Sequence, residues 1–181
     1  MSARRSSVPE PIPSEMFVER RRGYQAEPFA QPLSQEQFLP ALEDAMQNAR
    51  GTVLVIDADQ FSAIRAQGEG AIAEAMQLIE RAIRASVRAE DLVGRIKGGK
   101  FAIFLWGAEA TLSEQIATRI CESVEDTIFL ASARQIGTLS VSVGGTQTQL
   151  GQGAQQEIER ASEMLAEAQA QGRSVVRVEA A

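Results

Sequence analysis

The sequence predicts an α/β (α+β) fold, in which helices pack over a mixed central sheet. Three observations carry this prediction. The 181 residues suit one domain with one core. The chain is 44% hydrophobic and 23% charged, as in ordinary soluble globular proteins. Apolar segments of helical and strand period follow one another in the order α-β-α-α-β-β-α-β-β-α-β, which a helix-covered mixed sheet satisfies most economically.

The first 33 residues differ from the rest and are expected to form a flexible tail, with the folded domain spanning residues 34–181. They hold five of the six prolines and two arginine clusters, at 4–5 and 20–22, and show neither helical nor strand period. The arginines could contact an acidic partner or anionic lipid. Four glutamates in the same segment nearly cancel their charge, so a solvated tail is favoured.

The first half of the domain begins with a helix. "SQEQ" is a capping box with Ser34 as the N-cap, and the helix is expected to run to about Ala49 and end at Gly51. "TVLVID" (52–57) predicts a buried strand. Asp59 is expected to cap a short helix through Ile64. A longer helix follows, with one apolar face formed by Ile72, Met76, Ile79, Ile83 and Val87.

The second half supplies most of the strands. "DLVGRI" (91–96) and "KFAIFLW" (100–106) predict two strands joined by a glycine turn, and "TIFLAS" (127–132), "TLSVSVGG" (138–145) and "SVVRVE" (174–179) predict three more. Thr111 and Glu114 form a second capping box, opening a helix expected to bury Leu112, Ile116, Ile120 and Val124. The last helix, from about 154 to 171, is expected to end at Gly172.

Composition excludes several function classes. The net charge is −6 and the pI is about 4.9, which argues against general nucleic-acid binding. Histidine is absent, so catalytic triads that need it and most zinc sites are excluded. The single cysteine, Cys121, is expected to be a small core residue. No apolar run of about 18 residues and no signal peptide are found, so a cytoplasmic protein without a membrane span is expected.

Four segments resemble the GGDEF domain of the diguanylate cyclase family: "VLVIDADQFSAI", "RAEDLVGRIKGGKFAIFL", "LSVSVGG" and "ASEMLAEAQAQGRSVV". Each is weak alone, but they occur in the family's order at nearly its spacing, between about Asp57 and Val178. The resemblance implies a nucleotidyl-cyclase-like, mainly antiparallel sheet flanked by helices. In this family, two GTP-bearing domains meet to make cyclic di-GMP with the help of two metal ions.

The positions that carry this chemistry in the family are mostly altered here. Asp57 fits one metal-binding aspartate. In the signature turn, Lys97 stands at the first glycine and Gly98 keeps the second, while Gly99 and Lys100 replace the metal-binding acid and the glutamate. The remaining correspondences concern GTP: Arg65 for the guanine-reading Asn, Ala73 or Glu74 for the guanine-reading Asp, Gln169 for the phosphate-holding Lys, and the retained Arg173.

These replacements predict a domain without catalytic residues, cofactors or bound metal. One carboxylate beside a lysine cannot hold two Mg²⁺ ions, and replacing an acid with lysine changes the local charge by two units. Asp57 is then expected to be a relic at the strand end or the partner of a nearby Lys or Arg.

A second family site matches better. Arg88-Ala-Glu-Asp91 fits the R-x-x-D motif of the inhibitory site that binds cyclic di-GMP, and Arg119 falls on the family's second arginine. Arginine can donate two hydrogen bonds to guanine, and aspartate can accept from its N–H groups. The alternative is a solvated ion pair of little energetic value.

The sequence therefore predicts a catalytically inactive GGDEF protein that binds cyclic di-GMP through Arg88, Asp91 and Arg119, and regulates a protein partner or a homodimer. A ligand-independent scaffold for dimerisation or docking remains the alternative. A working cyclase is disfavoured by Gly99 and Lys100.

Overall fold

The computed structural model describes residues 31–131 and 134–181, and the side chains of 128–138 are not described. The predicted tail therefore lies almost wholly outside the described residues. Its last residues do not: Leu33 forms a parallel bridge with Gly94, donating to the Val93 carbonyl at 2.9 Å and accepting from the Arg95 N–H at 2.7 Å. The chain is thus already paired with the sheet before the first helix begins.

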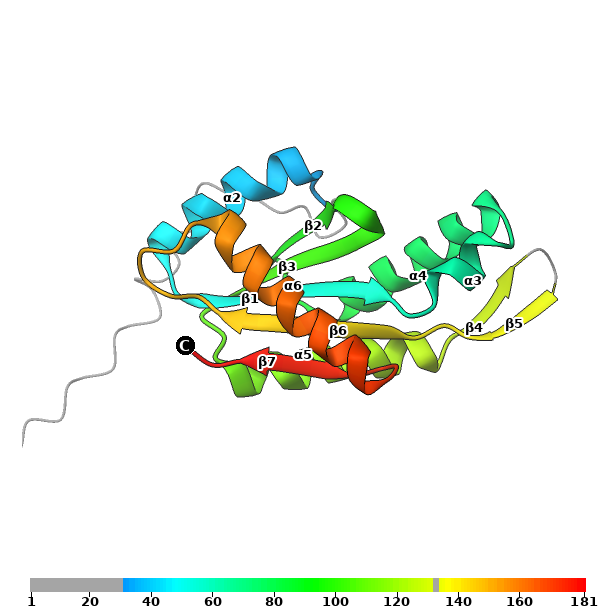
Figure 1. The fold of residues 1–181 in the computed structure, drawn as a ribbon. Coiled ribbons are helices and arrows are strands. Elements are labelled where there is room, and N and C mark those ends of the chain that lie inside the picture. Colours follow the sequence, from blue (N-terminus) through cyan, green and yellow to red (C-terminus); the bar gives the residue numbers. More distant parts are fainter. Residues whose placement is uncertain (1–30, 132–133) are drawn as a thin grey trace, which may run out of the picture.

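A five-stranded sheet forms the centre, in the order β2-β3-β1-β6-β7 (Figure 1). All neighbouring pairs are antiparallel except β6 and β7. Its strands are β1 (Gly51–Ala58), β2 (Leu92–Ile96), β3 (Lys100–Trp106), β6 (Val141–Gln147) and β7 (Val176–Glu179). The predicted mixed, mainly antiparallel sheet is confirmed.

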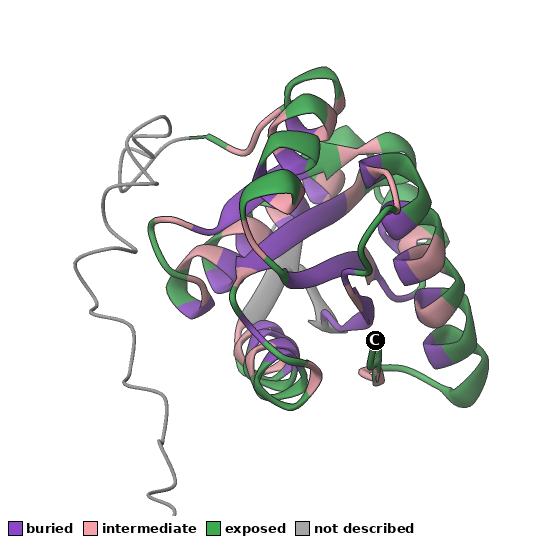
Figure 2. Cartoon of the chain, turned by 90° about the vertical axis from the view of Figure 1, so that its left-hand side faces the viewer, coloured by how far each residue is buried: buried purple, intermediate pink, exposed green. Residues whose placement is uncertain are grey.

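Helices cover both faces of the sheet (Figure 1). They are α2 (Gln35–Asn48), α3 (Phe61–Arg65), α4 (Glu69–Ser86), α5 (Ala110–Glu125) and α6 (Ala154–Gln171). Alternate residues of β1 point to opposite faces. Leu54 and Ile56 pack in the core with α4 and α5, whereas Val53 and Val55 pack in the core with α2 and α6. Figure 2 shows the consequence: buried strands lie inside helices whose outer faces are exposed.

The contact between β6 and α6 depends on a glycine. A Cβ atom at Gly144 would overlap backbone atoms of Ala161 and Leu165. The helix can therefore lie against the strand only because this position has no side chain.

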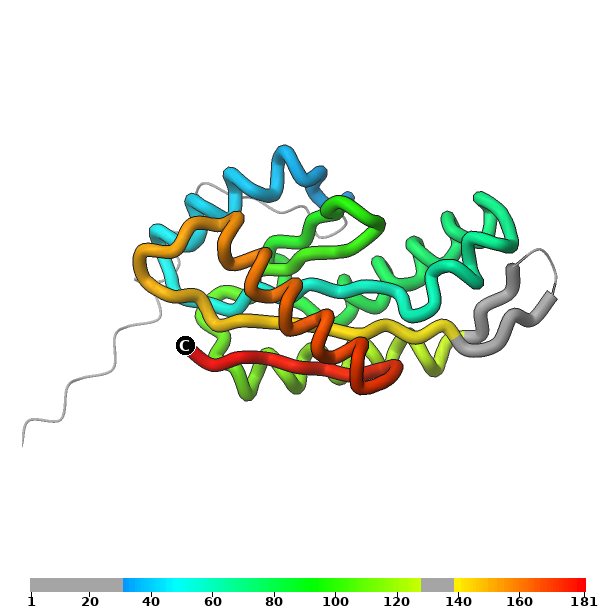
Figure 3. Tube along the Cα trace, in the orientation of Figure 1, coloured from blue at the N-terminus to red at the C-terminus, as the bar shows by residue number. Residues whose placement is uncertain are grey.

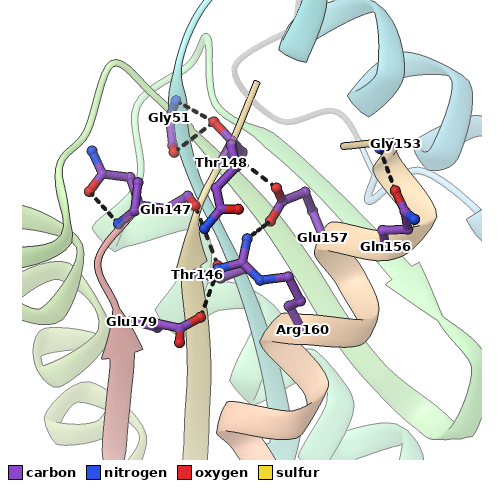
Figure 4. A network of polar contacts seen from close by, with 11 residues as sticks. Gly51, Thr146, Gln147, Thr148, Gly153, Gln156, Glu157, Arg160 and Glu179 are labelled. Carbon is purple, nitrogen blue, oxygen red and sulfur yellow. Dashed lines mark hydrogen bonds and ion pairs between the residues drawn. The ribbon is translucent and has the colours of Figure 1, made fainter. Parts of the chain in front are cut away.

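A buried carboxylate, that of Glu157, fixes the N-terminal end of α6. Glu157 is fully buried, accepts a hydrogen bond from the Gln149 N–H at 3.0 Å and pairs with Arg160 at 3.0 Å. Arg160 also reaches Glu179 on β7 at 2.7 Å (Figure 4). This network ties the last strand to the last helix, and its charges are paired as burial requires.

Local signals predicted some helix ends well. Ser34 caps α2 in a capping box with Gln37, and Gly172 stands at the C-cap of α6. Two predicted starts were wrong. The N-cap of α3 is Gln60 and not Asp59, and α5 begins at Ala110 after Glu109 rather than at a Thr111 box.

The burial and strand predictions also need correction. The predicted buried face of α5 is confirmed at Ile120 and Val124 and wrong at Leu112, which is 40% exposed. Ile116 is only partly buried, and Ser113 and Ala117 lie on the buried face instead. Gly51 opens β1 rather than ending α2. A strand not predicted, β5 (Arg134–Thr138), pairs with β4 (Ile128–Ala131) in a separate two-stranded sheet.

Candidate functional site

Two regions contain the residues singled out by sequence, and β2 separates them. The first is the turn Lys97–Gly99 (η1) between β2 and β3, together with the C-terminal ends of β1 and α6. Figure 3 shows the hairpin tip, α3 and the C-terminal end of α6 lying toward the end of the sheet where β1 terminates. The second is the turn from α4 into β2, which carries Arg88 and Asp91.

At the first region, Asp57 is partly buried at the end of β1. The Gln169 side-chain amide donates to its carboxylate at 3.4 Å. Burial raises the pKa of Asp57, although the Gln169 hydrogen bond and the nearby Lys100 charge oppose the rise. The structure thus brings Asp57, Gln169 and Lys100 together, and places a cation beside the Asp57 carboxylate.

The turn itself has a backbone that favours glycine. Gly98 has φ of 82° and Gly99 has φ of 78°, a region that other residues adopt only with strain. A Cβ atom at Gly99 would lie 3.8 Å from the Phe61 ring, on which the Arg65 guanidinium stacks at 5.2 Å from the ring centre. Arg65 therefore lies on the α3 side of the turn.

These residues do not fit a metal centre. Over residues 31–131 and 134–181, no three His, Cys, Asp or Glu side chains are grouped as ligands for one ion. Mg²⁺ in nucleotide sites is held by carboxylates together with substrate phosphates. Here the charged neighbours of Asp57 are Asp59 and Lys100. The Asp59 carboxylate already accepts hydrogen bonds from two serine hydroxyls, and the Lys100 ammonium repels a divalent cation.

The sequence did not reveal that a further carboxylate at this end, that of Asp59, connects several elements. Asp59 is 9% exposed, and its two oxygens accept from the hydroxyls of Ser140 and Ser142, both at 2.8 Å. The Ser174 N–H donates to it at 2.9 Å. Asp59 thus links β1, β6 and the turn after α6 that carries Arg173. The available signal was a pair of serines two residues apart, Ser140 just before β6 and Ser142 within it, because alternate residues of an extended segment face the same side.

At the second region, the Asp91 carboxylate is hydrogen-bonded to the backbone. Asp91 is 4% exposed; one oxygen accepts from the Arg88 N–H at 2.8 Å and the other from the Trp106 N–H at 3.1 Å. Burial raises the pKa of Asp91 despite these two hydrogen bonds. The Arg88 side chain is exposed.

Arg119 reaches the same corner from α5. Its guanidinium donates to the Ser86 carbonyl, in the last turn of α4, at 2.6 Å. The three predicted residues therefore gather where α4 ends. Arg88 and Arg119 are exposed, whereas Asp91 is buried.

This arrangement of sheet and helices defines a cyclase-like domain, and comparisons with known proteins identify its family. The family model "Diguanylate cyclase, GGDEF domain" matches residues 31–175. The chain therefore belongs to the GGDEF domain family.

Individual relatives support this family membership. The chain is 32% identical over 98 residues to the "Probable diguanylate cyclase DgcC" of Escherichia coli K12, covering 54% of this chain and 26% of that protein. It thus spans about a quarter of the length of the curated relative it matches. The GGDEF domain of DgcB from Caulobacter crescentus, solved in complex with c-di-GMP, superimposes with a TM-score of 0.76 at 17% identity, covering 85% of this chain and 95% of that one.

The fold is also shared with SiaD from Pseudomonas aeruginosa, a diguanylate cyclase solved with its activator SiaC. The TM-score is 0.75 at 20% identity, covering 92% of this chain and 65% of that one. These solved structures confirm the fold. In the described part of this chain, no helix has the length and apolar character needed to span a bilayer.

Proposed function

We propose that this GGDEF domain is catalytically inactive and binds cyclic di-GMP at the end of α4, as a cytoplasmic effector or regulator. The observation that carries the proposal is the meeting of Arg88 and Arg119 from different elements at one exposed corner. The Asp91–Arg88 hydrogen bond and the Arg119–Ser86 hydrogen bond both lie there. DgcB, which shares the fold, was solved with c-di-GMP.

Each residue has a distinct role in the proposed site. Arg88 and Arg119 offer guanidinium forks, which suit the O6 and N7 acceptors of guanine as well as phosphate oxygens. Asp91 holds the turn from which Arg88 projects. Its oxygens each keep a lone pair after accepting one N–H, so the carboxylate can still accept from guanine once a change in the turn exposes it.

The loss of catalysis rests on the first region. By the sequence correspondence, Gly99 and Lys100 replace the acids of the family's turn, and Arg65 replaces the guanine-reading Asn. The contact of Gln169 with Asp57 supports this proposal. Two-metal chemistry needs ligands for both ions, and the neighbouring Asp59 carboxylate is already engaged by the Ser140 and Ser142 hydroxyls.

A ligand-independent scaffold is the second candidate, and the burial of Asp91 favours it. A carboxylate that caps the Arg88 and Trp106 N–H groups needs no ligand to justify its presence. Under this reading, Arg88 is a solvated side chain.

Equilibrium dialysis against cyclic di-GMP tests the proposal. The full chain is expected to retain the ligand, and Arg119→Ala to retain at least about tenfold less at the same concentration, because a hydrogen bond to a charged group contributes about 1.5–3 kcal/mol. Retention by neither protein would favour the scaffold. Equal retention by both would place any binding site elsewhere.

A further inference from the structure

The two edges of the central sheet differ in what lies beside them. At one edge, β2 already has a neighbour, because the Leu33 N–H donates to the Val93 carbonyl at 2.9 Å and the Leu33 carbonyl accepts from the Arg95 N–H at 2.7 Å. At the other edge, β7 is the outermost strand in the described part of the chain (Figure 1). An edge strand presents backbone groups to which another strand can add. We therefore consider what could join the sheet at β7.

The pairing of β7 with β6 decides which of its backbone groups face outward. The two strands are parallel, and the Val143 N–H donates to the Val175 carbonyl at 2.9 Å. Because backbone groups alternate in direction along a strand, those of Val176 and Val178 point away from β6. Among residues 31–131 and 134–181, no hydrogen-bond partner is found for these outward groups. They are thus available to a further strand.

The side chains of β7 lie on two faces, and the face toward α6 is charged. The two valines pack against the core on the α5 side. On the α6 side, Arg177 pairs with Glu167, and Glu179 pairs with Arg160 at 2.7 Å. The side chains of Arg177 and Glu179 nevertheless remain 47% and 48% exposed. Each can therefore contact an opposite charge on an added strand.

These two charges complement each other when two copies of β7 are placed antiparallel. With Val178 opposite Val178 of a second copy, Arg177 of each copy lies opposite Glu179 of the other, and opposite charges in such pairs stabilise a sheet. A shift of the centre by one residue places Arg177 opposite Arg177, or Glu179 opposite Glu179, and like charges there are destabilising. The charge pattern therefore selects the register centred on Val178, in which the outward backbone groups of the two copies meet.

We propose that β7 is a self-association edge, at which two copies of the chain join their sheets through antiparallel β7 strands. Each copy presents the same strand to the other, so the contact closes at a dimer. Across it, Glu167 and Arg177 of one copy and Glu179 and Arg160 of the other form a row of alternating charge. Since β2 lies at the opposite edge of the sheet, the Arg88 turn stays open, and association needs no cyclic di-GMP.

Sedimentation velocity of the full chain without ligand tests the proposal, at protein concentrations up to about 0.5 mM, where weak complexes are populated. The wild type is expected to form a dimer as its concentration rises. Salt is expected to weaken the dimer, because two of its contacts are exposed charge pairs. Amide hydrogen exchange locates the contact: the Val178 N–H should be protected only at concentrations where the dimer is populated.

Two charge variants test the register, because each places like charges opposite one another in a homodimer. Arg177→Glu and Glu179→Arg are each expected to weaken dimerisation by at least about tenfold. Mixed in equal amounts, the two variants should form a heterodimer, since every cross-strand pair is then of opposite charge. Arg50→Glu, an exposed change outside β7, is the control and should leave dimerisation within about twofold. Circular dichroism establishes that each variant is folded.

The proposal is overturned if the wild type stays monomeric up to the highest concentration, if Arg177→Glu dimerises as well as Arg50→Glu, or if the two charge variants do not associate when mixed. A dimer in which the Val178 N–H exchanges as fast as in the monomer would also overturn it, because the contact would then lie elsewhere. None of these outcomes bears on cyclic di-GMP binding, which Arg88→Ala tests separately.

Discussion

Asp91 accepts a hydrogen bond from the backbone N–H of Arg88 at 2.8 Å, so the acid of the R-x-x-D motif closes the turn that carries its arginine. Its other oxygen joins this turn to the end of β3 through Trp106. The pattern that suggests a ligand site is therefore also part of the fold, and the two roles make separate predictions.

Asp91→Asn is expected to lower the free energy of unfolding by about 1–3 kcal/mol. The change replaces one of the two acceptor oxygens with an NH2 group, so one backbone N–H loses its acceptor and buried donors face each other. Urea denaturation measures the effect. Asp44→Asn, an exposed change on α2, is the control and should alter stability by less than about 0.5 kcal/mol. Equal effects at both positions would contradict the structural role of Asp91.

The same carboxylate predicts a pH dependence. Burial raises the pKa of Asp91 in the folded state above its ordinary value of 3.8. The folded state then binds the proton more tightly than the unfolded state, so this residue makes the free energy of unfolding fall as pH rises from about 4 through the raised pKa.

Above the raised pKa, this contribution becomes constant. Measured between pH 3.5 and 7.5, the stability difference between wild type and Asp91→Asn should shift against the wild type as pH rises, then level off. A difference that shifts toward the wild type over the same range would show that the pKa is lowered.

Cys121 should be inert in the folded protein. The thiol is 3% exposed, its S–H donates to the Val141 carbonyl at 3.3 Å, and burial raises its pKa to about 12. The thiolate, which is the reactive form, is therefore scarce at neutral pH. A thiol-reactive dye at pH 8 should label the native chain only on the timescale of unfolding, and at once in denaturant. Rapid native labelling would show an open path to Cys121.

Gly144→Ala should destabilise the fold by at least about 1–3 kcal/mol, because its Cβ would overlap the α6 backbone, which cannot give way as a side chain can. Gly70→Ala is the matched control: it lies in α4, and a Cβ there meets no other atom within 4 Å. Alanine should leave stability unchanged or raise it by up to about 1 kcal/mol there. Thermal unfolding of the two variants compares them, and equal midpoints would refute the close contact between β6 and α6.

Incubation with GTP and Mg²⁺ should yield no cyclic di-GMP above background. Gly99→Asp combined with Lys100→Glu should not restore synthesis, because the proposed inactivity also rests on Arg65 and Gln169, which replace the expected GTP-binding Asn and Lys. Chromatography of the nucleotides over hours detects either outcome. Steady product formation by the wild type would show that the turn supports catalysis despite Lys100.

The sequence predicted what depends on short-range signals. The Ser34 capping box, the Gly172 helix end and the paired glycines of the turn each act within a few residues, and each lies where expected. The sheet followed from the order of apolar segments and from the family resemblance.

What the sequence did not reveal depends on distant partners. Asp59 was predicted to cap a helix, but Ser140, Ser142 and Ser174, which lie 81 to 115 positions away along the chain, engage its carboxylate instead. Asp91 likewise accepts a hydrogen bond from the Trp106 N–H of β3, which lies 15 positions away along the chain. The spacing of the motif was enough to single out Arg88 and Asp91. It could not show that both oxygens of the Asp91 carboxylate accept hydrogen bonds from backbone N–H groups.

The most direct test of the central claim is a calorimetric titration of the full chain with cyclic di-GMP at micromolar protein, in parallel with Arg88→Ala and the control Arg81→Ala. The proposed function predicts saturable binding heat for the wild type and for Arg81→Ala, and loss of that heat for Arg88→Ala. The absence of binding heat in the wild type, or equal heat in all three proteins, would contradict it.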